Sequence, residues 1–341
     1  MNHPHKFIMR LVFFGTPDFA VPTLAALLNQ PPFEVLGVVT QPDQPQGRGQ
    51  RIQPSPVKVL AQQHHLPLWQ PQRLRQDLAV QQALNSLKAD VFVVVAYGQI
   101  LPPEVLAMPR WGCVNGHASL LPKYRGAAPI QWALVNGESR TGITVMLMDQ
   151  GMDTGPIFAM QEVAIDLFTS LPELWQELSE LTAQLLPKTL RQLPALTPLP
   201  QDDSQATYAP LIQPEHYGIR WQKTSLQIHN QVRGFYPNCW GLFQGQRVKI
   251  LETIPLTGAL LPQVHSRFPE LKLFDPPPQT TPGTVIALEK KFGPVVTTQD
   301  GSIILKTVQP PGKRAMSGGD WWRGLRLEIG EKWTETPPLG D

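Results

Sequence analysis

The run Val91-Phe-Val-Val-Val-Ala96 decides the fold. Five apolar residues and an alanine, without any alternation of polar side chains, are typical of a strand that is buried on both faces. Such strands occur almost only in parallel sheets that are covered by helices on both sides. This run therefore predicts an α/β fold.

The segments before this run alternate between strand and helix patterns. Residues 7–14 and 35–40 have the pattern of strands, whereas 21–29, 57–64 and 78–88 have the pattern of helices. Alternation of this kind predicts a doubly wound, Rossmann-like parallel sheet with right-handed crossovers.

Ligands of such a sheet bind beyond the carboxyl ends of its strands. The loops 15–18, 41–53 and 97–100 each follow one of the predicted strands. We therefore expect these three loops to form one functional edge.

The pattern changes towards the C-terminus. A predicted helix at 171–192 is followed by a Pro-rich, polar stretch at 193–206, which is typical of a linker. Short β-type runs between Gly and Pro residues then predict a small OB-like β-barrel; these runs are 248–251, 283–288, 294–298 and 302–308.

This organisation gives two domains. We predict a catalytic domain over residues 7–192, the linker over 193–206, the barrel over 207–330 and a tail over 331–341. Residues 260–282 are rich in proline and are predicted to form an extended surface loop.

Composition narrows the class of protein. The 341 residues are 42% apolar and 16% charged, with a net charge of +2, which suits packed domains and not a strongly basic chromatin protein. No run of about 18 apolar residues occurs, so we predict no membrane partner. Residues 7–14 are interrupted by Arg10 and resemble a strand more than a signal peptide. Cys113 and Cys239 are far apart and indicate reduced thiols in a cytoplasmic protein without a metal site.

Charge is divided unevenly along the chain. Residues 207–341 contain 15 Lys or Arg and 11 Asp or Glu, a formal charge of +4, so the remaining residues carry −2. A basic second domain modestly favours a polyanionic partner, although many unrelated domains have a similar charge.

The densest polar cluster is Cys113-Val-Asn-Gly-His-Ala-Ser-Leu-Leu-Pro-Lys-Tyr-Arg125. If this piece is extended, Asn115 and His117 point to the same face. An amide donor beside an imidazole can stabilise a developing oxyanion and supply a proton. The turn Asp149-Gln-Gly-Met-Asp-Thr-Gly155 adds two carboxylates, and a carboxylate near a histidine can set its tautomer. Together these groups suit acyl transfer without a covalent intermediate. By residue type alone, a packed histidine and two turn-forming aspartates are the commoner outcome.

The motifs of this cluster resemble those of the 10-formyltetrahydrofolate-dependent formyltransferases. In that family Asn-x-His is followed by a Ser-Leu-Leu-Pro folate loop, which matches Asn115-Gly-His-Ala-Ser-Leu-Leu-Pro122, and Asp149–Gly155 matches a further motif. The resemblance is close over residues 10–164 and sparser in the second half, where Val232-Arg-Gly-Phe-Tyr-Pro237 and Gly312-Lys-Arg-Ala-Met-Ser317 are its landmarks. One departure is Gly116-His-Ala118, because the family more usually has a β-branched residue at 116 and Gly at 118.

The resemblance implies roles for the matching residues. Asn115, His117 and Asp153 align with the catalytic triad of the family, whereas Asp149 falls outside it and is expected to be structural. Asn115 and His117 would hold the oxyanion, His117 would pass a proton to N10 of the folate, and Asp153 would position His117. The expected folate-lining residues are Ser119, Leu120, Leu121 and Pro122.

The amine acceptor is expected to be methionyl initiator tRNA, with N-formylmethionyl-tRNA and tetrahydrofolate as products for translation initiation. The long polar loop at 41–53 resembles a loop that wedges into the acceptor stem in tRNA-acting relatives, and Asp153-Thr-Gly155 fits that group better than the relatives that act on nucleotide sugars. The candidate tRNA contacts are basic residues of this loop or of the barrel: Arg48, Arg51, Arg233, Lys249, Lys306, Lys313 and Arg314. We expect a monomer.

Three alternative functions make different demands on the sequence. A formyltransferase or deformylase for a small metabolite would need neither the Arg48 loop nor a basic barrel. A catalytically dead tRNA-binding protein would be expected to lack Asn115, His117 or Asp153, yet all three are present. An NAD-dependent dehydrogenase would need Gly-x-Gly-x-x-Gly after the first strand, where the chain has Gly15-Thr-Pro-Asp18.

Overall fold

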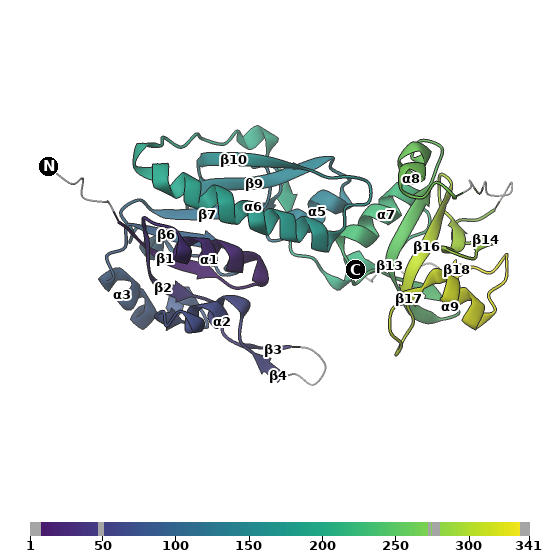
Figure 1. Ribbon diagram of the computed structural model, residues 1–341, viewed down its shortest axis with the longest axis horizontal. Helices are drawn as coiled ribbons and strands as arrows, with labels where there is room; N and C mark the ends of the chain where they lie inside the picture. Colours follow the sequence, from purple (N-terminus) through teal and green to yellow (C-terminus); the bar gives the residue numbers. More distant parts are fainter. Residues whose placement is uncertain (1–7, 47–50, 272–273, 275–279, 335–341) are drawn as a thin grey trace. The chain divides into compact units, whose positions relative to one another are not determined.

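The computed structural model describes residues 8–46, 51–271, 274 and 280–334. The chain divides into two compact units (Figure 1). Unit 1 comprises residues 1–129, 140–164 and 172–210, and unit 2 comprises 130–139, 165–171 and 211–341. The division is not a single cut, because two short segments of the first half group with unit 2.

Unit 1 is built on a mixed sheet with the strand order β10-β9-β7-β6-β1-β2-β5. Neighbouring strands from β5 to β7 are parallel, whereas β9 runs antiparallel to β7 and β10 antiparallel to β9. The strands are β1 (Met9–Gly15), β2 (Phe33–Val39), β5 (Leu68–Trp69), β6 (Val91–Val95), β7 (Cys113–His117), β9 (Arg140–Leu147) and β10 (Ile157–Ala164).

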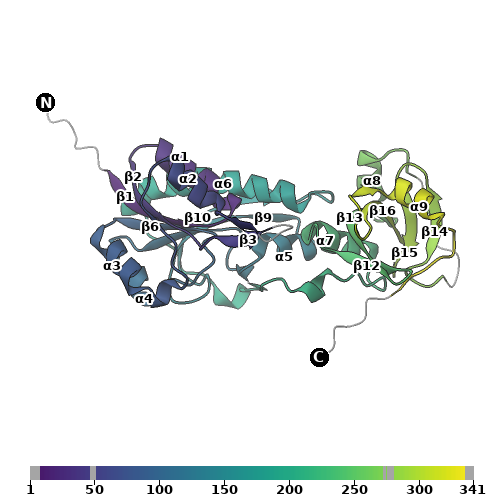
Figure 2. The ribbon, with the colours of Figure 1, turned by 90° about the horizontal axis from the view of Figure 1, so that it is seen from below.

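Helices cover both faces of this sheet, as the continuous apolar run of β6 predicts. Every residue of β6 is buried. Figure 2 shows α1, α2 and α6 on one face and α3 and α4 on the other. These helices are α1 (Val21–Asn29), α2 (Pro56–Gln63), α3 (Leu78–Ser86), α4 (Pro103–Leu106) and α6 (Leu171–Gln192). The doubly wound, Rossmann-like prediction is confirmed for unit 1.

Short elements fill the connections. The loop predicted at 41–53 contains the hairpin of β3 (Gln44–Gln46) and β4 (Arg51–Gln53). A two-stranded parallel ladder joins β8 (Arg125–Gly126) to β11 (Tyr208–Ala209). The remaining short elements are η1 (Asp18–Ala20), η2 (Leu74–Gln76), α5 (Pro129–Val135), η3 (Leu193–Ala195) and η4 (Asp203–Gln205).

The segment predicted as a linker packs on unit 1. Leu199 exchanges two backbone hydrogen bonds with Ile157, the first residue of β10. The side chain of Gln201 bonds to the turn that precedes β10. The Pro-rich segment 193–206 is therefore a strap that is attached along unit 1.

Unit 2 is an antiparallel sheet with the order β14-β15-β16-β13-β12-β18, and β17 pairs with β16. Its strands are β12 (Trp240–Phe243), β13 (Gln246–Leu256), β14 (Val285–Glu289), β15 (Gly293–Thr297), β16 (Ser302–Gln309), β17 (Met316–Ser317) and β18 (Trp333–Thr334). Its helices are η5 (Pro214–Tyr217), α7 (Ser225–Gly234), α8 (Leu261–Arg267) and α9 (Gly318–Leu325).

Unit 2 buries side chains of both α8 and α9 in its core. The prediction of an extended loop at 260–282 is wrong at its start, where α8 forms and buries Val264 against Ile254 and Leu256. Trp321 of α9 packs in the core, where it is 3% exposed beside Phe243 and Trp333.

Candidate active site

The polar cluster lies at the carboxyl edge of the parallel strands. In β7, Asn115 pairs with Val94 of β6 on one side and with Met146 of β9 on the other. A Cβ atom on Gly116 would lie 2.8 Å from Thr182 Cγ2 of α6, so residue 116 faces that helix. Because side chains alternate along a strand, Asn115 and His117 point together to the opposite face.

His117 is buried and both ring nitrogens have a neighbour. Nε2 lies 3.0 Å from the carbonyl oxygen of Tyr124, and Nδ1 lies 3.6 Å from Oδ2 of Asp153. A carbonyl can only accept, so Nε2 carries a hydrogen. Nδ1 is therefore the nitrogen at which this ring can exchange a proton, and it faces the carboxylate.

Asp153 is held in an unusual backbone conformation. Its φ is +55°, in the left-handed region that non-glycine residues rarely occupy. Its Oδ2 accepts a hydrogen bond of 2.8 Å from the backbone N–H of Gly126. The structure thus brings together His117 and Asp153, which are 36 residues apart in the sequence.

Asp149 has a local role. Its Oδ1 accepts hydrogen bonds from the backbone N–H of Gly151 and from the hydroxyl of Thr154. The carboxylate closes the turn between β9 and β10, in agreement with the structural role expected for it.

The loop predicted to line the folate site follows β7 directly. Thr144 of β9 fixes it, because its hydroxyl donates to the carbonyl oxygen of Ser119 and accepts from the N–H of Leu121. The Ser119 hydroxyl is buried and donates to the carbonyl oxygen of Lys123. Leu121 is also buried, whereas Leu120 and Pro122 are partly exposed.

The three loops expected at one functional edge are joined by hydrogen bonds. Thr16 Oγ1 donates to the carbonyl oxygen of Tyr97, and the backbone N–H of Gln41 donates to Thr16 Oγ1. The side-chain amide of Gln41 also donates to the carbonyl oxygen of Gly98. The three loops therefore lie together at one edge of the sheet, as predicted.

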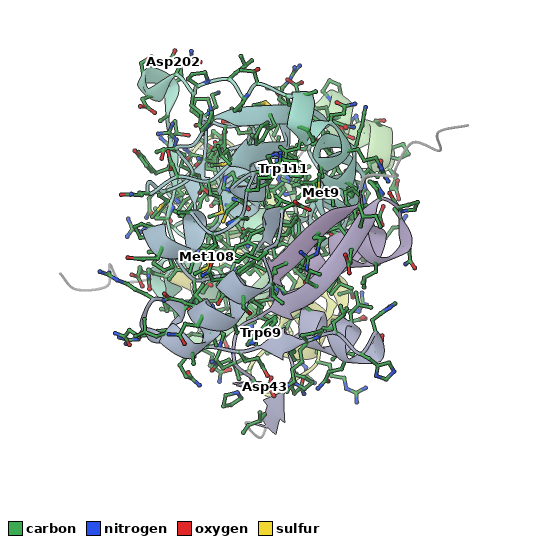
Figure 3. All side chains as sticks on the ribbon, turned by 90° about the vertical axis from the view of Figure 1, so that its left-hand side faces the viewer. Met9, Asp43, Trp69, Met108, Trp111 and Asp202 are labelled. Carbon is green, nitrogen blue, oxygen red and sulfur yellow. The ribbon has the colours of Figure 1, made fainter. Side chains whose placement is uncertain are left out.

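The β3–β4 hairpin follows this edge and is anchored by Asp43, which Figure 3 shows at the base of the hairpin. The Asp43 carboxylate accepts from Lys58 Nζ at 2.6 Å and from Gln70 Nε2 at 2.7 Å. Hydrogen bonds from Lys58 and then Gln70 hold the pKa of Asp43 below its usual value. Of the two arginines predicted here, Arg48 lies outside the described residues, and Arg51 begins β4.

The basic residues predicted in unit 2 differ in their surroundings. Lys313 and Arg314 are exposed, Lys249 is half-buried, and Lys306 pairs with Glu252. Arg233 is 8% exposed and donates to Asn230 Oδ1 and to the carbonyl oxygens of Asp166 and Thr169. Burial lowers its pKa to about 10. Such a guanidinium holds the 166–169 turn against α7 and is poorly placed to contact a phosphate.

Neither cysteine has the properties of a nucleophile. Both are buried free thiols, and burial raises the pKa of Cys113 to about 12. Within the described residues, no group of His, Cys, Asp and Glu is arranged to hold a metal ion. In the same part of the chain, every helix is too short or too polar to span a bilayer.

Sequence reasoning missed Gln201 and Arg125, which contact the loops around Asp153. The oxygen of the Gln201 amide accepts from Arg125, and its nitrogen donates to the carbonyl oxygens of Asp153 and Gly155. Gln201 carried no sequence signal, because it lies in the Pro-rich strap.

Comparisons with known proteins agree with this geometry. The family described as Formyl transferase matches residues 9–190, and the family described as Formyl transferase, C-terminal domain, matches residues 211–326. Proteins named methionyl-tRNA formyltransferase from Cyanothece sp. and Thermosynechococcus vestitus are each 52% identical to this chain. The alignments cover 95% and 96% of this chain and 99% of each relative.

A solved structure has the same fold. It is WlaRD, a sugar 3N-formyl transferase crystallised in the presence of dTDP and 5-N-formyl-THF. The TM-score is 0.62 at 20% identity, over 90% of this chain and all of that chain.

Proposed function

The chain belongs to the formyl transferase family, and we propose that it transfers the formyl group of 10-formyltetrahydrofolate to the free amino group of methionyl initiator tRNA. The products are N-formylmethionyl-tRNA and tetrahydrofolate, for translation initiation. The observation that carries this function is the pairing of His117, on the strand that bears Asn115, with Asp153 of the turn between β9 and β10. Identity of 52% to proteins named methionyl-tRNA formyltransferase, over nearly the whole chain, supports the acceptor.

The residues at this edge suit acyl transfer to an amine. The folate supplies an activated formyl group, and the amine nitrogen forms a bond to the formyl carbon while the bond from that carbon to N10 breaks. The Asn115 amide donates to the formyl oxygen as negative charge develops on it, and His117 donates to this oxygen from Nδ1 once that nitrogen has taken up the proton of the attacking amine. Asp153 stabilises the positive charge of His117 when the ring holds a second proton.

Protons balance without any other reactant. The attacking amine loses one proton and the departing N10 gains one. His117 carries this proton on Nδ1, because its Nε2 hydrogen is used in the bond to Tyr124. The hydrogen bond from Gly126 holds the Asp153 carboxylate in place, and this carboxylate keeps Nδ1 of His117 directed towards the reacting atoms.

Both substrates need further contacts. Ser119, Leu120, Leu121 and Pro122 would line the folate site. The loop at 41–53, which contains Arg48 and Arg51, would contact the tRNA acceptor stem. Unit 2, as an OB-like barrel, would contact the tRNA backbone through Lys249, Lys306, Lys313 and Arg314. The enzyme would act as a cytoplasmic monomer, with residues 7–192 as the catalytic region and 207–330 as the tRNA-binding region.

The acceptor is tested by competition between substrates. The enzyme is given 10-formyltetrahydrofolate with a labelled formyl group, together with methionyl initiator tRNA, the same tRNA uncharged, or an amino-sugar nucleotide. Label is expected only on the charged tRNA, and it should be released with the methionine when the ester is hydrolysed. Label on the amino sugar but not on the tRNA would overturn the proposed acceptor and leave a small-molecule formyltransferase.

A further inference from the structure

We propose that Gln201 is a positioning residue for formyl transfer, which fixes the two loops that hold the His117–Asp153 pair. This role rests on the proposed function, because it concerns the geometry of the same site. Gln201 lies on the strap of residues 193–206 and touches neither His117 nor Asn115 in any hydrogen bond of the described residues.

The Gln201 side chain uses its full hydrogen-bonding capacity. Nε2 donates to the carbonyl oxygens of Asp153 and Gly155, at 2.8 and 2.7 Å. Oε1 accepts from Nε and from a terminal nitrogen of Arg125, at 3.2 and 2.8 Å. An amide has two donors and two acceptor lone pairs, so all four are used. Its orientation is fixed as well, since arginine can only donate and carbonyls can only accept.

The two loops joined by this amide are those that contact the catalytic pair. On one side is the turn 153–155, which contains the Asp153 carboxylate. On the other side is the segment 124–126. Within it, Tyr124 accepts from His117 Nε2 and Gly126 donates to Asp153 Oδ2. The Gln201 side chain therefore sets the distance between the Asp153 carboxylate, which faces Nδ1 of His117, and the Tyr124 carbonyl, which accepts from Nε2.

These loops need such a restraint because their backbones are strained. Asp153 and Tyr124 have φ values of +55° and +61°. Non-glycine residues in this region strain the backbone and persist only where the surroundings fix them. The bonds from Gln201 to the Asp153 and Gly155 carbonyls fix the turn, and Asp203, which accepts from Arg125 at 2.6 Å, fixes the other end.

The variant Gln201→Glu separates this role from simple packing. Glutamate has the same length and shape, and it keeps an acceptor for Arg125. It has no N–H group, so at neutral pH its second oxygen faces two carbonyl oxygens and repels the turn. The matched control is Gln205→Glu, because Gln205 is an exposed glutamine on the same strap that bonds only to Asp202 among the described residues.

Two measurements test the proposal. At saturating substrates, Gln201→Glu should lower kcat for formyl transfer by about 10- to 100-fold, since displacement of a catalytic group by about 1 Å has effects of this size. Both KM values should stay within about threefold of wild type, and Gln205→Glu should match wild type. In the enzyme without substrates, the side-chain ¹⁵N signals of His117 should shift in Gln201→Glu and remain in place in Gln205→Glu.

The outcomes distinguish this proposal from the proposed function. If the wild type fails to formylate methionyl initiator tRNA while the ¹⁵N signals still shift, the function is wrong and the positioning role stands. If wild type is active and Gln201→Glu retains its kcat and its ¹⁵N signals, the positioning role is wrong. Gln201→Met removes all four bonds without repulsion and should show the same two effects more weakly. If both variants lose their cooperative unfolding transition, Gln201 is required for folding and the positioning role is overturned.

Discussion

At the scale of single residues, His229 of α7 is a buried histidine that must stay neutral. Its Nε2 lies 2.8 Å from the carbonyl oxygen of Leu167 and its Nδ1 lies 2.9 Å from the hydroxyl of Thr253. The carbonyl requires hydrogen on Nε2, so Nδ1 accepts from the hydroxyl. Burial is the main cause that lowers the pKa of His229, to about 4.

This pKa predicts a pH dependence of stability. The unfolded chain binds a proton on this residue near pH 6.5, whereas the folded chain does so only near pH 4. Unfolding therefore takes up a proton between these values, and stability falls as pH falls, by at most about 1.4 kcal/mol per pH unit. Urea unfolding at pH 7, 6 and 5 measures this slope. In the variant His229→Gln, the slope of the free energy of unfolding against pH should be smaller by the contribution of about one proton. Equal slopes for the variant and the wild type would contradict the assignment.

The identities of the site residues could be predicted from the sequence, but their backbone strain and their hydrogen-bond partners could not. Asn115, His117 and Asp153 stand out because they are polar groups in a strand-to-loop junction and because they match a family motif. The φ of Asp153 and the bonds of Gln201 depend on contacts between segments 27 to 76 residues apart, which have no local pattern. Arg233 is predicted as a tRNA contact from its charge alone, but its buried guanidinium donates to acceptors within the protein.

At the scale of elements, Gly116 allows α6 to pack closely on β7. A Cβ atom there would lie 2.8 Å from Thr182 Cγ2 and 3.2 Å from Leu186 Cδ1. The departure from a β-branched residue at position 116 thus has a structural reason in this chain, since the helix occupies the space of the missing side chain.

A double-mutant cycle tests this packing. Gly116→Ala should reduce the free energy of unfolding by about 1–3 kcal/mol, because the methyl group overpacks the interface. Thr182→Ser removes Cγ2 and keeps the hydroxyl that bonds to Leu178. The double variant should regain much of the loss, which would appear as a coupling of at least about 0.5 kcal/mol in urea unfolding. Strictly additive effects would mean that Thr182 does not limit the space.

Elements with strong periodicity were predicted well. The helix at 21–29 and the helix at 171–192 form with the predicted bounds, since apolar residues recur at helical spacing in both. Secondary structure was not predicted where tertiary contacts determine it. α8 lies in a Pro-rich context, and the hairpin β3–β4 lies in a polar loop whose base is held by Asp43 and Lys58.

At the scale of the whole molecule, charge is divided unevenly along the chain, with +4 in residues 207–341 and −2 in the rest. The basic excess lies in residues 207–341, and the exposed pair Lys313 and Arg314 follows β16. The domain limits could be predicted only roughly. For example, Trp132 packs against Phe235 of unit 2, although it lies between strands of unit 1 in the sequence.

The proposed contact of this basic pair with tRNA predicts a salt effect. The logarithm of the association constant for tRNA should fall linearly with the logarithm of salt concentration. The double variant Lys313→Ala and Arg314→Ala should reduce the steepness of this slope by about one to two, and weaken binding of all tRNAs alike. Lys188→Ala, an exposed site on α6, should leave the slope unchanged. Filter binding from 50 to 200 mM salt measures it, and an unchanged slope in the double variant would exclude the pair as phosphate contacts.

In the proposed mechanism, His117 carries the proton of formyl transfer to methionyl initiator tRNA. The single-turnover rate constant of that transfer measures this role, with His117→Ala compared with wild type and with His64→Ala, an exposed histidine of unit 1. We predict a fall of about 10²- to 10⁴-fold for His117→Ala, the usual contribution of a general acid–base group, and no change for His64→Ala. A His117→Ala variant that folds and transfers formyl at the wild-type rate would contradict the account.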